Sequence, residues 1–469
     1  MNKQAARLYS IVSDWSAALI AWLLFYFVRV KIEGFHPDYN FFSLLYGGIP
    51  IATFWLLVYT FWGFYYDIFR KSRIRELFSI FNACLIGIAL IYLLLILDVD
   101  GTQNYKRYYR TVAIYFGIHA VVTGLAKTFV LTYIKKLILR KAISFNTIIV
   151  GSSHNAKEIY HEIEQNNPHL GLNFLGYVYV TDEHHDKEGM GLQGLPNLGD
   201  YHNLEQTIED NKVEQVIIAI ESSEHKTIED LLNTVEGTQA KVAIIPDIYQ
   251  ILLGAVRVNH LYGIPLIEVK QNLMPYWQMV TKRTMDIVVS LLVLTLGFPF
   301  LFVVGLITWL TSKGPVLYRQ ERIGQFGVPF NILKFRSMRV DAEQMGPQLS
   351  SSHDPRITNW GRFMRKTRLD EFPQFYNVLV GDMSLVGPRP ERQYFIDRIV
   401  AVAPHYKHLN RVRPGITSLG QVKYGYAENV DQMVRRLKYD ILYIENMSLA
   451  MDFRIFLYTV ITMLGGKGK

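Results

Sequence analysis

Four apolar stretches of similar length lie within the first 141 residues of the chain. They cover about 8–27, 42–64, 78–97 and 111–133, with polar or charged segments between them. Each stretch approaches the roughly 20 residues that an α-helix needs to cross a bilayer. The hydrophobic pattern therefore predicts a four-helix transmembrane module over residues 1–141.

Basic residues at the ends of these stretches predict how the module is oriented. The positive-inside rule places the ends with more Lys and Arg in the cytoplasm. One set of ends carries Lys3, Arg7, Arg70, Lys71, Arg73, Arg75, Lys135, Lys136, Arg140 and Lys141. The other set carries fewer, namely Arg29, Lys31, Lys106, Arg107 and Arg110. The chain after residue 141 is therefore expected to lie in the cytoplasm.

Between residues 145 and 267 the pattern changes to short β-branched runs that alternate with helical segments. This alternation predicts a Rossmann-like, parallel α/β domain over residues 142–270. Its first strand-to-helix turn, 151–156, has only the first of the three glycines of a dinucleotide fingerprint. A structural turn is the favoured interpretation. An anion held by Ser152 and Ser153 at the helix start is the first alternative, and NAD-type binding is the second.

Composition agrees with a membrane protein that also carries soluble domains. Half of the residues are hydrophobic and 19% are charged, against roughly 25% charged residues in an ordinary soluble protein. The formal net charge of +8 has three interpretations: a nucleic acid partner, an anionic membrane surface, or phosphorylated substrates. The single cysteine, Cys84, excludes an intrachain disulfide.

The strongest candidate chemistry is the adjacent pair Asp370 and Glu371. Basic residues precede the pair, and Arg389 follows between two prolines. A carboxylate can accept a phosphoryl group covalently, and carboxylate oxygens suit a hard divalent cation. Arginine is the residue suited to bidentate phosphate recognition. On composition alone, ordinary ion pairs at a helix start explain these residues equally well.

Four stretches beyond residue 281 carry a resemblance to a known family. They are 282–286 (KRTMD), 334–338 (KFRSM), 368–390 (RLDEFPQFYNVLVGDMSLVGPRP) and 411–417 (RVRPGIT). They resemble the polyisoprenyl-phosphate hexose-1-phosphate transferases, the bacterial sugar transferase family. The order of four spans, α/β domain and this block is similar to its long members, the undecaprenyl-phosphate galactose and glucose phosphotransferases. The resemblance implies a mainly helical, monotopic catalytic domain over residues 271–469.

The resemblance also implies a reaction. Asp370 would attack the β-phosphate of a UDP-sugar, release UMP and hold the phospho-sugar covalently. Undecaprenyl phosphate would then accept the sugar 1-phosphate in a ping-pong exchange that initiates exopolysaccharide, capsule or O-antigen synthesis. Asp370 and Glu371 match the family's Mg²⁺-binding pair. Phosphate-binding positions match Lys334, Arg365 and Arg389, with Arg336 the weaker candidate.

The implied partners and location follow from the same resemblance. The partners are a UDP-sugar, undecaprenyl phosphate, the lipid bilayer and a second copy of the chain, and nucleic acid is not among them. The implied location is the bacterial inner membrane, with the α/β and catalytic domains on its cytoplasmic face. The chain departs from the family's pattern at Phe298, where short members have serine, and at 418–421 and 423–429. The last two departures leave the sugar open.

The apolar run at 287–310 contains Pro299 near its middle. Proline lacks an N–H and its ring clashes with the preceding helical turn, so a kink is expected there. Nucleotide sugars are cytosolic, and a fifth crossing would place Asp370 on the side without substrate. Basic residues at both ends of the run also favour both ends inside. We therefore expect a re-entrant helix over 286–311, with a straight span as the alternative.

Two other functions remain open at this level. A membrane-anchored nucleotide-sugar dehydratase or epimerase would need a glycine-rich NAD loop and a Tyr-x-x-x-Lys pair. The loop does not match, and the sequence has no such pair. A non-enzymatic membrane scaffold would not need Asp370, so replacing this residue separates the scaffold from the enzyme.

Overall fold

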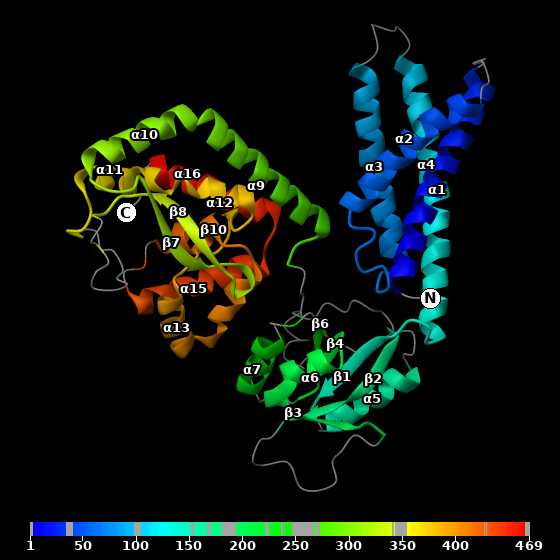
Figure 1. Cartoon of the computed structure of the whole chain (residues 1–469). Helices are drawn as coiled ribbons and strands as arrows, with labels where there is room; N and C mark the ends of the chain where they lie inside the picture. The colour runs from blue at the N-terminus through cyan, green and yellow to red at the C-terminus, as the bar shows by residue number, and fades with distance from the viewer. Residues whose placement is uncertain are drawn as a thin grey trace. The chain divides into compact units, whose positions relative to one another are not determined.

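The computed structural model describes most of the chain, and it separates into two compact units. The described residues are 3–33, 41–97, 105–151, 154–166, 170–180, 194–220, 225–235, 238, 240–245, 267–268, 273–339, 342, 354–425, 427 and 429–464. The first unit comprises 1–223 with 240–269, and the second comprises 224–239 with 270–469 (Figure 1).

The first unit begins with a group of apolar helices. They are α1 (Lys3–Glu33), α2 (Phe41–Phe61), α3 (Arg73–Leu97) and α4 (Tyr105–Leu139). α1 packs against α2 and α4, and α3 packs against α4. α1, α3 and α4 are long and apolar enough to cross a membrane, whereas the described apolar part of α2, Tyr46–Phe61, is shorter. Apolar helices at the amino terminus are confirmed, and four complete crossings remain a prediction.

A buried ion pair joins two of these helices. Lys127 Nζ of α4 lies 2.6 Å from Asp14 Oδ2 of α1 and donates to Ser10 Oγ at 3.2 Å. The side chains of Lys127 and Asp14 are only 2% and 4% exposed. A buried charge that loses its partner is costly, so this pair fixes how α1 and α4 face each other.

A six-stranded sheet forms the second part of the first unit. Its elements are β1 (Phe145–Val150), α5 (His154–Asn166), β2 (Leu172–Tyr179), β3 (Asn197–Asp200), α6 (Leu204–Asp210), β4 (Gln215–Ile218), β5 (Lys241–Ile244) and β6 (Ile267–Glu268). The helix α7 (His225–Val235) lies between β4 and β5 in the chain but is grouped with the second unit. The order is β3-β2-β1-β4-β5-β6, and only β6 runs antiparallel to its neighbour. The predicted parallel α/β domain is confirmed. Ser152 and Ser153 lie outside the described residues.

The amino-terminal edge of this sheet contacts the apolar helices. Lys3 Nζ of α1 lies 2.5 Å from Glu214 Oε1, just before β4. Lys241, the first residue of β5, pairs with Asp67 of the α2–α3 connection. In parallel strands the carboxyl ends lie at the other edge. The turn at Gly151, which follows β1, is therefore on the edge that faces away from these contacts.

The second unit is mainly helical with two small sheets. Its elements are α9 (Tyr276–Leu296), α10 (Phe298–Thr311), β7 (Leu317–Ile323), β8 (Pro329–Phe335), α11 (Asn359–Thr367), the short 3₁₀ helix η4 (Leu369–Glu371), α12 (Gln374–Val380), β9 (Ser384–Val386), α13 (Gln393–Val402), η5 (Pro404–Arg411), β10 (Gly415–Thr417), α14 (Leu419–Lys423), α15 (Val430–Glu445) and α16 (Leu449–Leu464). β7 and β8 form an antiparallel pair, and β9 and β10 form a parallel pair.

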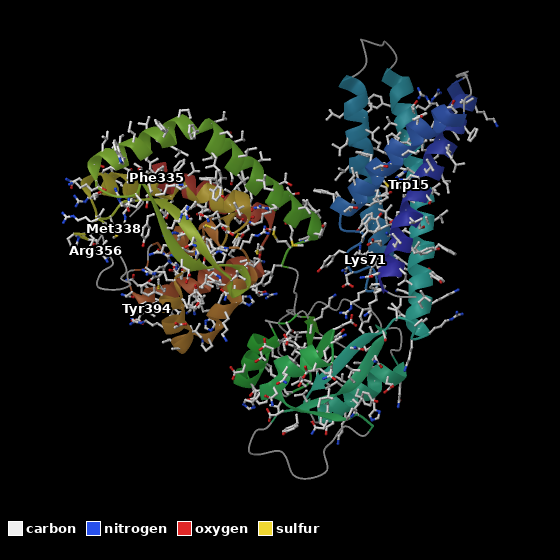
Figure 2. All side chains as sticks on the ribbon, viewed as in Figure 1. Trp15, Lys71, Phe335, Met338, Arg356 and Tyr394 are labelled. Atoms are coloured by element: carbon white, nitrogen blue, oxygen red, sulfur yellow. The ribbon has the colours of Figure 1, made fainter. Side chains whose placement is uncertain are left out.

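The apolar run of the second unit is bent, as its proline predicts. α9 and α10 meet at an angle of 63°. The break lies at Gly297, where a Cβ atom would come within 2.2 Å of Val293 O, and Pro299 sits in the first turn of α10. Proline is well tolerated there because its missing N–H has no helical acceptor. Val304 of α10 packs with Phe335 of β8 and Met364 of α11. Figure 2 labels Phe335 on the ribbon.

Candidate active site

A tight backbone turn places the two candidate carboxylates. α11 ends at Thr367, and Arg368 adopts φ 56°, in the left-handed region. This conformation is uncommon outside glycine and directs the chain into the next element abruptly. η4 follows at once and buries both Asp370 and Glu371, which are 8% and 5% exposed. The pair therefore sits on a 3₁₀ turn between α11 and α12, inside the unit.

Three basic side chains from separate segments surround Glu371. Lys334 Nζ of β8 lies 3.7 Å from Glu371 Oε1, and Arg389 Nη2, beyond β9, lies 3.4 Å from the same oxygen. Arg368 Nη1 lies 3.9 Å from Glu371 Oε2. Within the described residues, Oε2 is buried and makes no hydrogen bond. These distances are longer than those of a closed ion pair, and Oε2 of Glu371 is the oxygen of this cluster that could accept a further ligand.

Burial and the surrounding charges shift the pKa values of the two carboxylates in opposite directions. Burial acts to raise the pKa of Glu371, but Arg389, Lys334 and Arg368 outweigh it and hold this pKa below the ordinary value. Burial raises the pKa of Asp370, and the charge of Glu371 raises it further, against Lys334 and Arg365. Glu371 is therefore the more firmly ionised of the pair. Burial also lowers the pKa of Lys334 to about 8, although Glu371 opposes this shift.

The remaining predicted phosphate-binding residues occupy different places. Arg365 Nε donates to Ser337 Oγ at 3.0 Å, and its charge acts on Asp370. Arg336 instead donates from Nη2 to Ser312 O at 2.5 Å and to Ser312 Oγ at 2.7 Å, at the end of α10. The structure thus brings Lys334 and Arg389 together at Glu371, whereas Arg336 hydrogen-bonds to Ser312. The role of Arg336 in phosphate binding remains a prediction.

A second buried charge cluster lies directly after Arg389 and was not predicted. Arg436 Nη2 of α15 donates to Glu391 Oε1 at 2.6 Å, and Arg322 Nη1 of β7 lies 3.2 Å from Glu391 Oε2. Burial acts to raise the pKa of Glu391, but Arg436 and Arg322 outweigh it and lower this pKa. The only sequence signal was the position of Glu391 next to the prolines, because its partners are distant in the chain.

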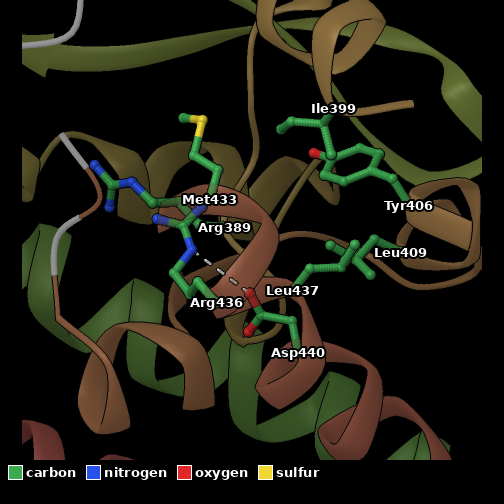
Figure 3. A pocket seen from close by; sticks show the side chains of 8 residues that line it. All are labelled: Arg389, Ile399, Tyr406, Leu409, Met433, Arg436, Leu437 and Asp440. Carbon is green, nitrogen blue, oxygen red and sulfur yellow. Dashed lines mark ion pairs between the residues drawn. The ribbon is translucent and has the colours of Figure 1, made fainter. Parts of the chain in front are cut away.

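Arg389 also borders a small recess on the side of α15 (Figure 3). The recess is lined by Arg389, Ile399, Tyr406, Leu409, Met433, Arg436, Leu437 and Asp440. Arg436 Nε lies 3.9 Å from Asp440 Oδ2. Burial raises the pKa of Asp440 to about 6, although Arg436 opposes the shift. Arg389 therefore links the carboxylate pair to this second group of charges.

The residues present fit a Mg²⁺ ion that is shared with a phosphorylated ligand. The described residues contain no group of three or more His, Cys, Asp or Glu that could hold a metal by themselves. Mg²⁺ commonly binds through one or two carboxylates and completes its shell with water and substrate phosphates. The buried, unbonded Oε2 of Glu371 is an available oxygen ligand beside Asp370.

Comparison with known proteins identifies the families that the chain matches. Residues 277–466 match the family model described as bacterial sugar transferase, and residues 60–246 match one described as a CoA-binding domain. A solved structure, UDP-D-quinovosamine 4-dehydrogenase from Vibrio fischeri, matches 27% of this chain and 95% of its own, at 16% identity. The TM-score of this match is 0.21.

Three relatives illustrate the likeness. The UDP-glucose:undecaprenyl-phosphate glucose-1-phosphate transferase of Xanthomonas campestris pv. campestris is 34% identical, over 68% of this chain and 66% of that protein. The UDP-N-acetylgalactosamine-undecaprenyl-phosphate N-acetylgalactosaminephosphotransferase of Aeromonas hydrophila is 39% identical, over 48% and 52%. A glucose-1-phosphate transferase of Caulobacter vibrioides is 42% identical, over 39% and 69%.

These matches define the class to which the protein belongs. The second unit is a sugar transferase domain, because the family model covers nearly all of it. The chain as a whole belongs to the bacterial sugar transferase family. The matched regions span 66% and 52% of the first two relatives, which is less than two thirds of their length.

Proposed function

We propose that this protein transfers a sugar 1-phosphate from a UDP-sugar to undecaprenyl phosphate and releases UMP. The observation that carries the proposal is the buried pair Asp370 and Glu371, with Lys334, Arg368 and Arg389 gathered around Glu371. A positively charged site built around one attacking carboxylate suits phosphoryl transfer, where positioning and electrostatics supply most of the catalysis. The names of the relatives support the same pair of substrates.

The proposed mechanism is a two-step exchange on Asp370. In the first step a carboxylate oxygen of Asp370 bonds to the β-phosphorus of the UDP-sugar. The bond from this phosphorus to the oxygen bridging the two phosphates breaks, and UMP leaves with the electron pair. In the second step a phosphate oxygen of undecaprenyl phosphate attacks the same phosphorus and frees the carboxylate. The product is an undecaprenyl-diphosphate sugar, and the two steps balance without an oxidant or a proton donor.

Each neighbouring group has a task in these steps. Lys334 and Arg389 stabilise negative charge that develops on the phosphate oxygens. Glu371 keeps these two cations close to Asp370 through its contacts of 3.7 and 3.4 Å. Asp370 and Glu371 would hold Mg²⁺, which when bound supplies neutralisation of the diphosphate charge.

The proposed topology is a re-entrant hairpin formed by α9 and α10, with the catalytic domain on one side of the membrane. Both ends of the hairpin contact the same folded unit. Lys282, near the start of α9, donates to Val386 O, and Ser312, just after α10, accepts from Arg336. The outward face of the hairpin is apolar and exposed at Leu291, Leu292, Leu296, Phe298, Phe302 and Trp309. A straight crossing would separate two ends that this unit holds together.

The location and the partners complete the proposal. Apolar helices of spanning length support a membrane protein. UDP-sugars are cytosolic, which favours the inner membrane with both the α/β and catalytic domains on its cytoplasmic face. Four amino-terminal crossings agree with this orientation. We also infer a homodimer and a role in starting exopolysaccharide, capsule or O-antigen synthesis, as the long members of the family imply.

The decisive experiment is a transfer assay with the full chain in nanodiscs. Labelled UDP-sugars are supplied one at a time with undecaprenyl phosphate and Mg²⁺, and UMP and labelled lipid are measured. We expect both products with at least one sugar, and neither product from Asp370→Asn. Asp397→Asn is the matched control because Asp397 is exposed on α13. Lipid product from Asp370→Asn at the wild-type rate would remove the assigned nucleophile, whereas absence of product from the wild type would leave the scaffold hypothesis standing.

A further inference from the structure

Two side chains in the first half of α9 hydrogen-bond to all three residues of β9. Asp286 Oδ1 accepts hydrogen bonds from Leu385 N at 3.0 Å and from Ser384 Oγ at 3.2 Å. Lys282 Nζ donates to Val386 O at 2.9 Å. Asp286 is 3% exposed, so these hydrogen bonds are shielded from water. Two side chains one helical turn apart on α9 therefore fix all three residues of the strand.

The backbone between β9 and Arg389 is closely packed. Gly387 follows β9, and its N–H donates to Thr417 O at 3.0 Å. A Cβ atom at Gly387 would lie 2.4 Å from Arg413 O, so the backbone has no free space at this point. Arg389 comes two residues later and reaches Glu371 Oε1 at 3.4 Å. A displacement of β9 would therefore be transmitted to the guanidinium of Arg389.

The same helix also braces the carboxylate side of the site. Arg283 Nη1 donates to Val378 O at 2.7 Å, and Arg283 Nη2 donates to Leu379 O at 2.9 Å. These carbonyls belong to the last turn of α12, where a basic side chain satisfies groups without a helical donor. α12 begins three residues after Glu371. One helix thus contacts the segments that carry both halves of the site.

We propose that Asp286, assisted by Lys282 and Arg283, is a positioning residue that aligns Arg389 with Glu371 through β9. This inference rests on the proposed function and assigns part of the catalytic scaffold to the helix that continues into the apolar hairpin. Asp286 accepts its hydrogen bonds from β9 and not from the groups around Glu371, so we expect its effect on turnover to be indirect. A residue that only stabilised the fold would change the amount of folded protein and leave turnover per folded molecule intact.

Asp286→Ala and Asp286→Asn test the hydrogen bonds separately from the fold. Asp286→Ala leaves Leu385 N and Ser384 Oγ without an acceptor, and we expect kcat to fall by about 10²-fold, the effect of a small misplacement of a reacting group. Asp286→Asn keeps an acceptor oxygen and is expected to restore most of the lost turnover. Thr284→Ala, at an exposed position on the same helix, is the control. Rates are normalised to the folded fraction from thermal unfolding.

A double-mutant cycle decides whether Asp286 acts through Arg389. In the Arg389→Ala background, we expect Asp286→Ala to add little further loss, because its target is already absent. Losses that multiply in full would overturn the proposal. If Asp286→Ala does not fold, Ser384→Ala removes one hydrogen bond without stranding a charge, and the same cycle applies to it. Absence of transfer by the wild type would refute the proposed function itself, and an active wild type with unchanged kcat in Asp286→Ala would refute only the positioning role.

Discussion

The ion pair of Asp14 and Lys127 in the first unit differs from the cluster at Glu371 in the second unit in both spacing and charge balance. Asp14 and Lys127 are paired one to one at 2.6 Å, and both are buried. Glu371 has three basic neighbours at 3.4 to 3.9 Å and one buried oxygen that makes no hydrogen bond within the described residues. The first pair is closed and neutral, whereas the second cluster is open and positive.

This difference separates a structural use of buried charge from a functional one. A closed pair contributes to the choice of one helix packing and offers nothing to a ligand. An excess of buried positive charge is unfavourable by itself and becomes favourable when an anion binds. The Glu371 cluster therefore has the electrostatics of a site whose charge balance is completed by a phosphorylated substrate.

The largest effect on stability is expected at the closed pair. Lys127→Met should lower the free energy of unfolding by about 3–5 kcal/mol, because it leaves Asp14 buried without a partner. Thermal unfolding in nanodiscs measures the loss, and Lys136→Met, at an exposed position of α4, is the control. Adding Asp14→Leu should recover much of the stability, since it removes the stranded charge. A double variant no more stable than Lys127→Met would show that packing, and not charge, determines the loss.

Glu371→Gln should act chiefly on turnover. The change removes the anion that gathers Lys334, Arg368 and Arg389, and we expect kcat/KM to fall by about 10²-fold. The transfer assay measures this loss, with Glu321→Gln on the exposed edge of β7 as control. The three cations would then repel each other, so phosphate should raise the unfolding temperature of the variant more than that of the wild type. Equal responses to phosphate would contradict an open, positive cluster.

The pH dependence of kcat/KM should reflect the protonation of Lys334. Its pKa of about 8 means that it is charged below pH 8 and loses its proton as the pH rises through this value. If this charge stabilises the transferred phosphate, kcat/KM should fall about tenfold per pH unit on the alkaline side. In Lys334→Arg the guanidinium stays charged, so the alkaline limb should move to higher pH. An unchanged alkaline limb in this variant would assign the titration to another group.

Much of the architecture could be predicted from the sequence, because its signals are local. The apolar stretches predict α1 to α4, the β-branched runs predict the parallel sheet, and Pro299 predicts the bend between α9 and α10. The Asp370–Glu371 pair is visible as adjacent carboxylates near basic residues. The partners of Glu391 were not predictable, because Arg322 and Arg436 lie 69 and 45 residues away and no spacing rule relates them. The close approach of the Gly297 backbone to Val293 O, where a Cβ atom would lie 2.2 Å from the oxygen, could not be predicted because it depends on the folded backbone geometry.

Arg336 gives the smallest effect and the clearest contrast between sequence pattern and structure. The family resemblance places Arg336 among the phosphate-binding residues, and in the structure its guanidinium donates hydrogen bonds to Ser312 at the end of α10. Arg336→Lys keeps the charge and loses the multiple hydrogen bonds, so the free energy of unfolding should fall by about 1 kcal/mol. The KM for the UDP-sugar should change by less than about threefold, a difference of roughly 0.6 kcal/mol. A KM raised by about tenfold at unchanged stability would instead place Arg336 on the phosphates, and the anchoring of α10 would then rest on the packing of Val304 with Phe335 and Met364.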